Sequence, residues 1–259
     1  MPAAPPTPSA PEIDRLAPAA RPGGTPAGYQ TWRDLTFLHW RVPAGVVADK
    51  LPAGLEVDTF GGDAWVGLVP FLMTGVRPRW FVPVPGVSTF RETNVRTYVT
   101  CRTDRGGREP GVYFFSLDAD AWPAVLVARR VWRLPYFRAS MALTKRAGRI
   151  TYETRRVWPG PRGAGGRVAV TPVGDTRAAE PGTLDHFLAE RYLLFTPGPG
   201  GTLLRGRVHH TPYPLRACGD VAVDDTLTAA AGFEVAGPPD HACYSPGVDV
   251  TIYPLRPAG

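Results

Sequence analysis

Four polar side chains alternate along the segment 88–102, STFRETNVRTYVTCR. If this segment is a β-strand, Glu92, Asn94, Arg96 and Tyr98 lie on one face, because successive side chains of a strand point to opposite sides. A carboxylate, an amide, a guanidinium and a phenol in one line can form the wall of a cavity that binds and polarises a small acidic ligand. The same alternation is typical of an antiparallel sheet whose polar face is solvated, and composition alone favours the solvated face.

Two further predicted strands repeat this pattern. LPYFRASMAL places Tyr136 and Arg138 on one face, and LRGRVHH ends on His209 and His210. Adjacent histidines on a strand face opposite ways, so one of the two can serve as an acid, a base or a ligand donor, and the sequence leaves open which. A hydrogen-bonded structural histidine is the alternative.

The sequence lacks the motifs of several common catalytic classes. It has no G-x-S-x-G elbow, no glycine-rich phosphate loop and no C-x-x-C pair. The five histidines do not show the spacing of zinc ligands. We therefore expect no metal and no cofactor.

Charge and cysteine content limit the partners. The net charge is +6, but the basic residues are scattered and form no block, so we expect no nucleic-acid partner. Three widely spaced cysteines suit reduced thiols, and neither a membrane-spanning run nor a secretion signal is present. These features predict a cytoplasmic protein without a membrane partner.

The elements that must position the polar strand are short and β-rich, since 29 Gly and 30 Pro punctuate Val-, Tyr- and Phe-rich runs. Residues 1–28 are rich in Pro and Ala and predict a disordered leader, followed by one domain over residues 29–259. The segment 88–102 should pair with VYFFSLDA as an antiparallel hairpin. Helices are expected over residues 122–132, after an N-cap at Thr183, and after an N-cap at Asp224.

Several segments carry a resemblance to a known family. The segments, in chain order, are TWRDLTFLHWRVP, LPAGLEVDTFGGDAWVGLVPF, FRETNVRTYV, GVYFFSLDA, LPYFRASM, FLAERY, GRVHHTPYPL and YSPGVDV. From about Trp32 to Val250 the chain resembles the uncharacterised YqjF-like family of bacterial proteins, which is related to acetoacetate decarboxylase. The resemblance implies an α+β fold with a mainly antiparallel, barrel-like curved sheet, a central cavity and a few peripheral helices. It also implies that Glu92 is a cavity carboxylate.

One departure from acetoacetate decarboxylase bears on the reaction. That enzyme works through a Schiff-base lysine, whereas the segment LPYFRASM, which resembles the lysine-bearing stretch, contains none. Lys50 and Lys145 are the chain's two lysines, and both are expected at the surface. We therefore expect that the chain is not a Schiff-base decarboxylase.

Together these observations predict a protein that binds a small anionic or carbonyl-bearing organic molecule. Arg96 and Arg138 would hold an oxygen of the ligand, and Glu92 would act as a general base or as a hydrogen-bond anchor. Asn94, Tyr136 and His209 would complete the site. Cofactor-free lyase or isomerase chemistry fits this set. The alternative is a non-catalytic ligand-binding or interaction protein on the same fold. The sequence leaves open whether the chain is catalytic and whether it forms a homo-oligomer.

Overall fold

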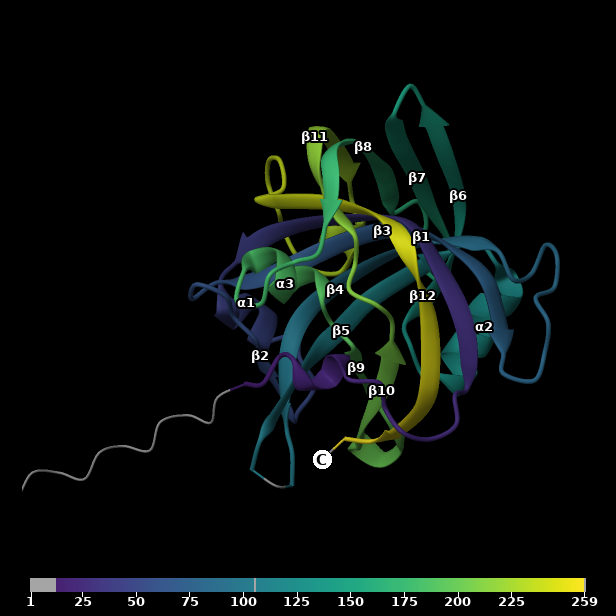
Figure 1. Cartoon of the computed structure of the whole chain (residues 1–259). Helices are drawn as coiled ribbons and strands as arrows, with labels where there is room; N and C mark the ends of the chain where they lie inside the picture. Colours follow the sequence, from purple (N-terminus) through teal and green to yellow (C-terminus); the bar gives the residue numbers. More distant parts are fainter. Residues whose placement is uncertain (1–12, 105, 259) are drawn as a thin grey trace, which may run out of the picture.

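The structure is a computed structural model that describes residues 13–104 and 106–258. The described residues form one curved twelve-stranded sheet with short helices at its periphery (Figure 1). The strands are β1 Gly28–Val42, β2 Leu55–Val57, β3 Ala64–Pro78, β4 Phe90–Arg102, β5 Arg108–Ala119, β6 Tyr136–Arg146, β7 Arg149–Trp158, β8 Gly165–Arg177, β9 Leu193–Pro197, β10 Leu203–His209, β11 Leu215–Asp225 and β12 His241–Pro257. The helices are η1 Ala17–Ala19, α1 Ala44–Ala48, α2 Trp122–Val131, α3 Leu184–Ala189, η2 Pro199–Gly201 and α4 Leu227–Ala230.

The strand pairings close on themselves in two rings. The nine-strand ring runs through β1, β3, β4, β5, β6, β7, β8, β11 and β12 and returns to β1. The seven-strand ring leaves β5 through β9 and β10 and rejoins at β12. Neighbouring strands are antiparallel except where β5 meets β6 and β9. The predicted α+β class with a mainly antiparallel curved sheet is confirmed, and so is the hairpin of β4 with β5.

Strand β4 belongs to both rings and is buried along nearly its whole length. Glu92, Thr93, Asn94 and Arg96 are all less than one-tenth exposed. One face of β4 lies beside a core cluster that includes Phe37, Phe71, Leu117 and Tyr136, and the other face contributes Val95 to a second cluster with Leu68 and Tyr152. The expectation of a solvated polar face is therefore wrong, because the closing of the sheet covers both sides of the strand.

The predicted helices are present, with one cap corrected. Helix α2 follows Ala121, and Thr183 caps α3 by accepting a hydrogen bond from the His186 backbone N–H at 3.4 Å. Before α4 the capping carboxylate belongs to Asp225 rather than Asp224. Its two oxygens accept from the backbone N–H groups of Leu227 and Thr228 at 3.0 and 2.9 Å.

The N-terminal segment contacts the sheet before β1 begins. Of the expected leader, residues 1–12 lie outside the described residues. From residue 13 onward, Arg15 forms an ion pair with the buried Asp58, and Arg207 donates to the backbone oxygens of Pro18 and Ala20 at 3.1 and 2.8 Å.

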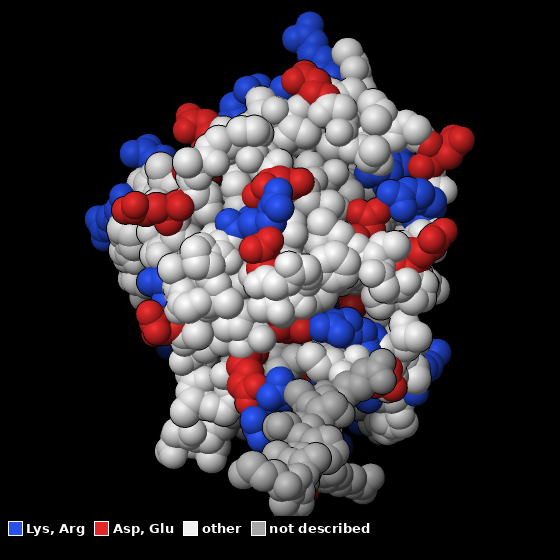
Figure 2. All heavy atoms as spheres, turned by 90° about the vertical axis from the view of Figure 1, so that its left-hand side faces the viewer, with Lys and Arg blue, Asp and Glu red and all other residues white. Residues whose placement is uncertain are grey.

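Two features concern the predicted partners, namely the distribution of charged side chains on the surface and the length of the helices. On the face drawn in Figure 2, acidic and basic side chains are interspersed rather than separated into areas of one sign. Among residues 13–104 and 106–258, none of the helices has the length and apolarity that crossing a bilayer requires.

Candidate functional site

The carboxyl group of Glu92 is the centre of the candidate site. It is 1% exposed, and the hydroxyl of Tyr136 on β6 donates to its Oε2 at 2.5 Å. Burial raises the pKa of Glu92 to about 7, against the opposing effect of hydrogen bonds from Tyr136 and Asn94. A carboxyl with this pKa exists in both protonation states near neutral pH, so it can either donate or accept a proton.

Sheet register explains why these groups meet. Glu92 lies opposite Ala119 on β5, and Ala119 lies opposite Arg138 on β6. Asn94, Leu117 and Tyr136 form the adjacent cross-strand row. Side chains in one row point to the same face of a sheet, so the register places Asn94, Tyr136 and Arg138 around the Glu92 position. The Nη1 atom of Arg138 is buried and has no hydrogen-bond partner among the described residues.

Arg96 lies on the same face of β4, farther along the strand. Its Cα is about 13 Å from that of Glu92 at the usual rise per residue, and its guanidinium turns toward α3. There Nη2 donates to the Leu188 backbone oxygen at 2.9 Å and to the Tyr98 hydroxyl at 3.2 Å. In the described part of the chain Arg96 forms no ion pair, and its Nε has no partner. The structure thus brings Glu92, Asn94 and Tyr136 together and leaves Arg96 at a distance.

Two other buried arginines have the carboxylate partner that Arg96 lacks. Arg156 donates through Nε and Nη2 to both oxygens of Asp118 at 2.8 and 2.7 Å, and Arg191 donates to Asp58 at 2.9 Å. Sequence reasoning missed both pairs, because the partners lie 38 and 133 residues apart and no local pattern joins them. Burying a cation without a counter-ion is costly, which makes Arg96 the unusual member of the three.

The two adjacent histidines differ in environment. His209, the predicted site residue, is half-buried on β10, where burial and then Arg21 and Arg207 lower its pKa. His210 is the buried one: it stacks on Tyr192 at a ring distance of 4.6 Å, and burial lowers its pKa to about 4. Tyr192 in turn donates to Glu190 at 2.5 Å. No sequence pattern indicated this Glu190–Tyr192 pair, which repeats the chemistry of Glu92 and Tyr136.

Both lysines are exposed and contact groups outside the Glu92 cluster. Lys145 pairs with the buried Asp34 at 2.5 Å, and Lys50 lies over the ring of Phe233 at 5.5 Å. Among the residues that the structure describes, the Glu92 carboxyl therefore has a phenol and an amide beside it and no amine.

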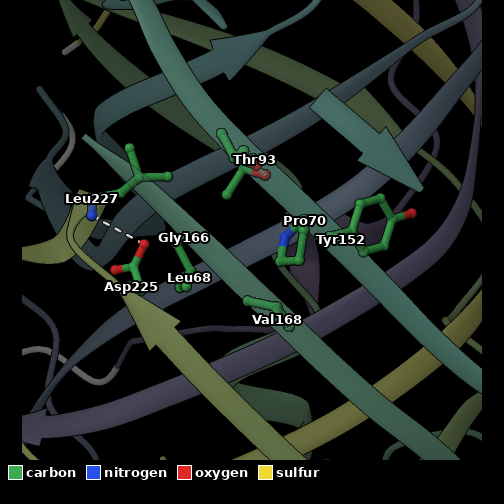
Figure 3. Close-up of a pocket in the computed structure, with 9 residues that line it drawn as sticks. Leu68, Pro70, Thr93, Tyr152, Gly166, Val168, Asp225 and Leu227 are labelled. Carbon is green, nitrogen blue, oxygen red and sulfur yellow. Dashed lines mark hydrogen bonds between the residues drawn. The ribbon is translucent and has the colours of Figure 1, made fainter. Parts of the chain in front are cut away.

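Two cavities of the structure lie away from Glu92. The first, about 10 Å³, is lined by Thr93, Tyr152 and Asp225 among others (Figure 3). This volume is at the limit for one water molecule. Thr93 follows Glu92 on β4, so its side chain points to the opposite face of that strand. The second is a surface groove of about 360 Å³ beside Lys145 and Arg149. Within the described residues, no group of three or more His, Cys, Asp or Glu side chains is arranged to hold a metal ion.

Comparison with known proteins gives a family and a fold. Residues 29–249 match DUF2071, a family described as an uncharacterized conserved protein. The chain is 38% identical over 228 residues to the uncharacterized protein YqjF of Bacillus subtilis (strain 168), covering 88% of this chain and 90% of that protein.

Among solved structures, the fold is similar to acetoacetate decarboxylase from Legionella pneumophila, with a TM-score of 0.63, 12% identity, and coverage of 93% of this chain and 92% of that chain. It is also similar to the enduracididine biosynthesis enzyme MppR complexed with pyruvate, with a TM-score of 0.60, 15% identity, and coverage of 90% and 91%. At these identities the likeness shows the fold alone.

Proposed function

This chain belongs to the DUF2071 family of uncharacterized conserved proteins, and from that premise we propose that it acts on a small anionic, carbonyl-bearing organic molecule by cofactor-free proton transfer at Glu92. The observation that carries the proposal is the buried Glu92 carboxyl, with a pKa of about 7 and a hydrogen bond from Tyr136 at 2.5 Å. General bases work best when their pKa lies near the operating pH.

The chemistry proposed is proton abstraction from the carbon next to a carbonyl. The C–H bond breaks, the proton passes to the Glu92 carboxylate, and the electron pair moves into an enolate whose charge rests on the former carbonyl oxygen. Return of the proton to another carbon gives isomerisation, and loss of a leaving group from the neighbouring carbon gives a lyase reaction. Tyr136 and Asn94 position the carboxyl through the hydrogen bonds described above.

The unpaired arginines support an anionic ligand. Among the described residues Arg96 and Arg138 form no ion pair, whereas Arg156 and Arg191 are paired with aspartates. Arg96 and Arg138 each also keep a buried nitrogen without a hydrogen-bond partner, as Arg191 does. A carboxylate or enolate oxygen would supply the missing acceptor. We also propose His209, which is half-buried on β10, as a catalytic residue together with Glu92 and Arg96.

A Schiff-base route finds no support in this chain. It needs a neutral amine within reach of the bound carbonyl, and both lysines are exposed and engaged elsewhere. One structure with this fold holds pyruvate, a small 2-oxo acid, and the ligand class proposed here is of that kind. We place the protein in the cytoplasm, with no nucleic-acid or membrane partner.

A second candidate is a non-catalytic ligand-binding protein. The closed packing favours it, since Glu92 is 1% exposed and neither cavity described above touches this residue. Both candidate functions require binding of the same class of ligand, but only the first includes a chemical conversion of that ligand.

A thermal-shift screen against 2-oxo acids and aromatic acids tests ligand binding. We expect a stabilising compound for the wild type, and loss of that shift in Glu92→Gln and Arg96→Ala. Tyr152→Phe serves as the control, because Tyr152 is as buried as Glu92 but lines the cavity of about 10 Å³, which Glu92 does not line. An undiminished shift in both site variants would refute the residue assignment. Binding without chemical change of the compound would select the non-catalytic candidate.

A further inference from the structure

Two histidines on neighbouring strands join the surface to the interior through hydrogen bonds. His39 on β1 and His241 on β12 are direct cross-strand partners, and their Nδ1 atoms are 3.2 Å apart. On the outer side, Nε2 of His241 lies 2.7 Å from Oδ1 of Asp185 on α3. On the inner side, Nε2 of His39 lies 2.7 Å from the hydroxyl of Tyr98 on β4. Four side chains from four elements thus form one unbroken chain.

The two ends of this chain differ in their access to water. The side chains of Asp185 and His241 are 17% and 11% exposed. His39 and Tyr98 are fully buried. The Tyr98 hydroxyl also lies 2.7 Å from the Leu188 backbone oxygen and accepts from Nη2 of Arg96 at 3.2 Å. The chain therefore runs from the surface at α3 to the guanidinium of Arg96.

Counting hydrogens allows two complete arrangements. In the first, Tyr98 donates to His39 Nε2, His39 Nδ1–H donates to His241 Nδ1, and His241 Nε2–H donates to Asp185, with both imidazoles neutral. In the second, Tyr98 donates to the Leu188 oxygen instead. His39 must then donate through Nε2–H to Tyr98 and accept at Nδ1, so His241 needs a proton on each nitrogen and becomes an imidazolium facing Asp185. The two arrangements differ by one proton.

From this geometry we propose that Tyr98, His39, His241 and Asp185 form a proton relay between the surface and the interior beside Arg96. A proton that arrives at the Tyr98 oxygen displaces the hydroxyl proton to His39 Nε2. The Nδ1 proton of His39 then passes to His241 Nδ1, and the resulting imidazolium is balanced by the Asp185 carboxylate. The positive charge crosses from the interior to the surface, and His241 releases the proton to water.

The surrounding charges place the positive charge on His241 rather than on His39. Burial, then His241 and Arg96, keeps the pKa of His39 well below its usual value. Arg191 also lies on the inner side, 5.0 Å from the Tyr98 ring, and its charge is paired with that of Asp58. On the outer side the hydrogen bond from His241, with help from Arg177, lowers the pKa of Asp185, so its carboxylate is available as a counter-ion. The buried thiol of Cys243 and the buried hydroxyl of Tyr213 have raised pKa values and stay neutral.

Nitrogen-15 NMR of the histidine rings tests the relay without any ligand, so its outcome is independent of the Glu92 proposal. At a pH where His241 is neutral we expect a proton on Nδ1 of His39 and on Nε2 of His241. On acidification the His39 proton should move to Nε2 with the same midpoint at which His241 gains its second proton. A His39 ring that keeps its tautomer while His241 titrates would overturn the relay.

Three variants sharpen the experiment. Asp185→Ala should shift the joint midpoint to lower pH, because the imidazolium loses its counter-ion. Arg177→Gln removes the other partner of Asp185, at 2.6 Å, and should preserve the joint titration. Tyr98→Phe deletes the acceptor that the second arrangement requires, so His39 should keep its proton on Nδ1 and the joint switch should move to lower pH or disappear. If Asp185→Ala does not fold, the Tyr98→Phe comparison decides, and an unchanged joint switch in that variant would refute the proposal.

Discussion

The raised pKa of Glu92 predicts that this one carboxyl lowers the stability of the fold as pH rises. In the unfolded chain its pKa takes the ordinary value of 4.5, whereas in the folded protein burial raises it to about 7. Between these two values the folded state binds the proton and the unfolded state does not. By linkage, the free energy of unfolding then falls with increasing pH across this window and is level on either side of it.

The size of the effect follows from the difference between the two pKa values. A difference of about 2.5 corresponds to about 3 kcal/mol, at 1.36 kcal/mol for each unit. Glu92→Gln replaces the carboxyl by a neutral group of the same shape and removes this dependence. Between pH 4.5 and pH 8 the wild type should therefore lose about 3 kcal/mol of unfolding free energy that Glu92→Gln keeps. The difference, variant minus wild type, rises by that amount.

Urea denaturation of both proteins across this pH range measures the difference directly. Other buried groups also titrate, among them Glu190, Asp118, Asp225 and His210. They are present in both proteins, so the subtraction cancels their contributions. A difference that stays flat across the range would show that Glu92 is ionised normally and would remove the basis for its role as a base at neutral pH.

Two further perturbations test the buried polar groups, one at Glu92 and one at the Asp118–Arg156 pair. Tyr136→Phe removes the hydrogen bond that opposes the rise in the Glu92 pKa, so the midpoint of Glu92 in carbon-13 NMR should move to higher pH. The matched Tyr152→Phe should leave it in place, and an equal shift in both would point to a general loosening of the core. Asp118→Ala removes the counter-ion of the Arg156 guanidinium, whose side chain is 2% exposed. This change should lower the free energy of unfolding by about 3–5 kcal/mol, because a buried charge is left unpaired. A loss below about 1 kcal/mol in urea denaturation would mean that water reaches Arg156.

The fold was predictable from sequence where local patterns determine it. Alternation and turn residues indicated β4, β5 and their hairpin, and Thr183 identified the start of α3. Alternation could not show that β4 is buried on both faces, because it records only that two faces differ. That burial depends on strands as distant as β7 and β12, and the resemblance to a known family supplied what the pattern lacked.

The candidate site was predictable only in part, for the same reason. The sequence placed Glu92 and Asn94 together because they share one strand, and Tyr136 joined them through sheet register. The side-chain direction of Arg96 depends on its contacts with Leu188, which no strand pattern encodes. Likewise, the His39–His241 contact joins residues 202 positions apart, so it emerges only from the closed pairing of β1 with β12.

Hydrogen–deuterium exchange of 2-oxo acids in D₂O, followed by proton NMR, tests the proposed proton transfer most directly. The wild type should accelerate exchange at the carbon next to the carbonyl above the buffer rate for at least one such acid that binds. Glu92→Gln should reduce this acceleration by about 10²–10⁴-fold, the usual contribution of a general base. Equal acceleration by the wild type and Glu92→Gln, or none by the wild type for an acid that demonstrably binds, would contradict the account.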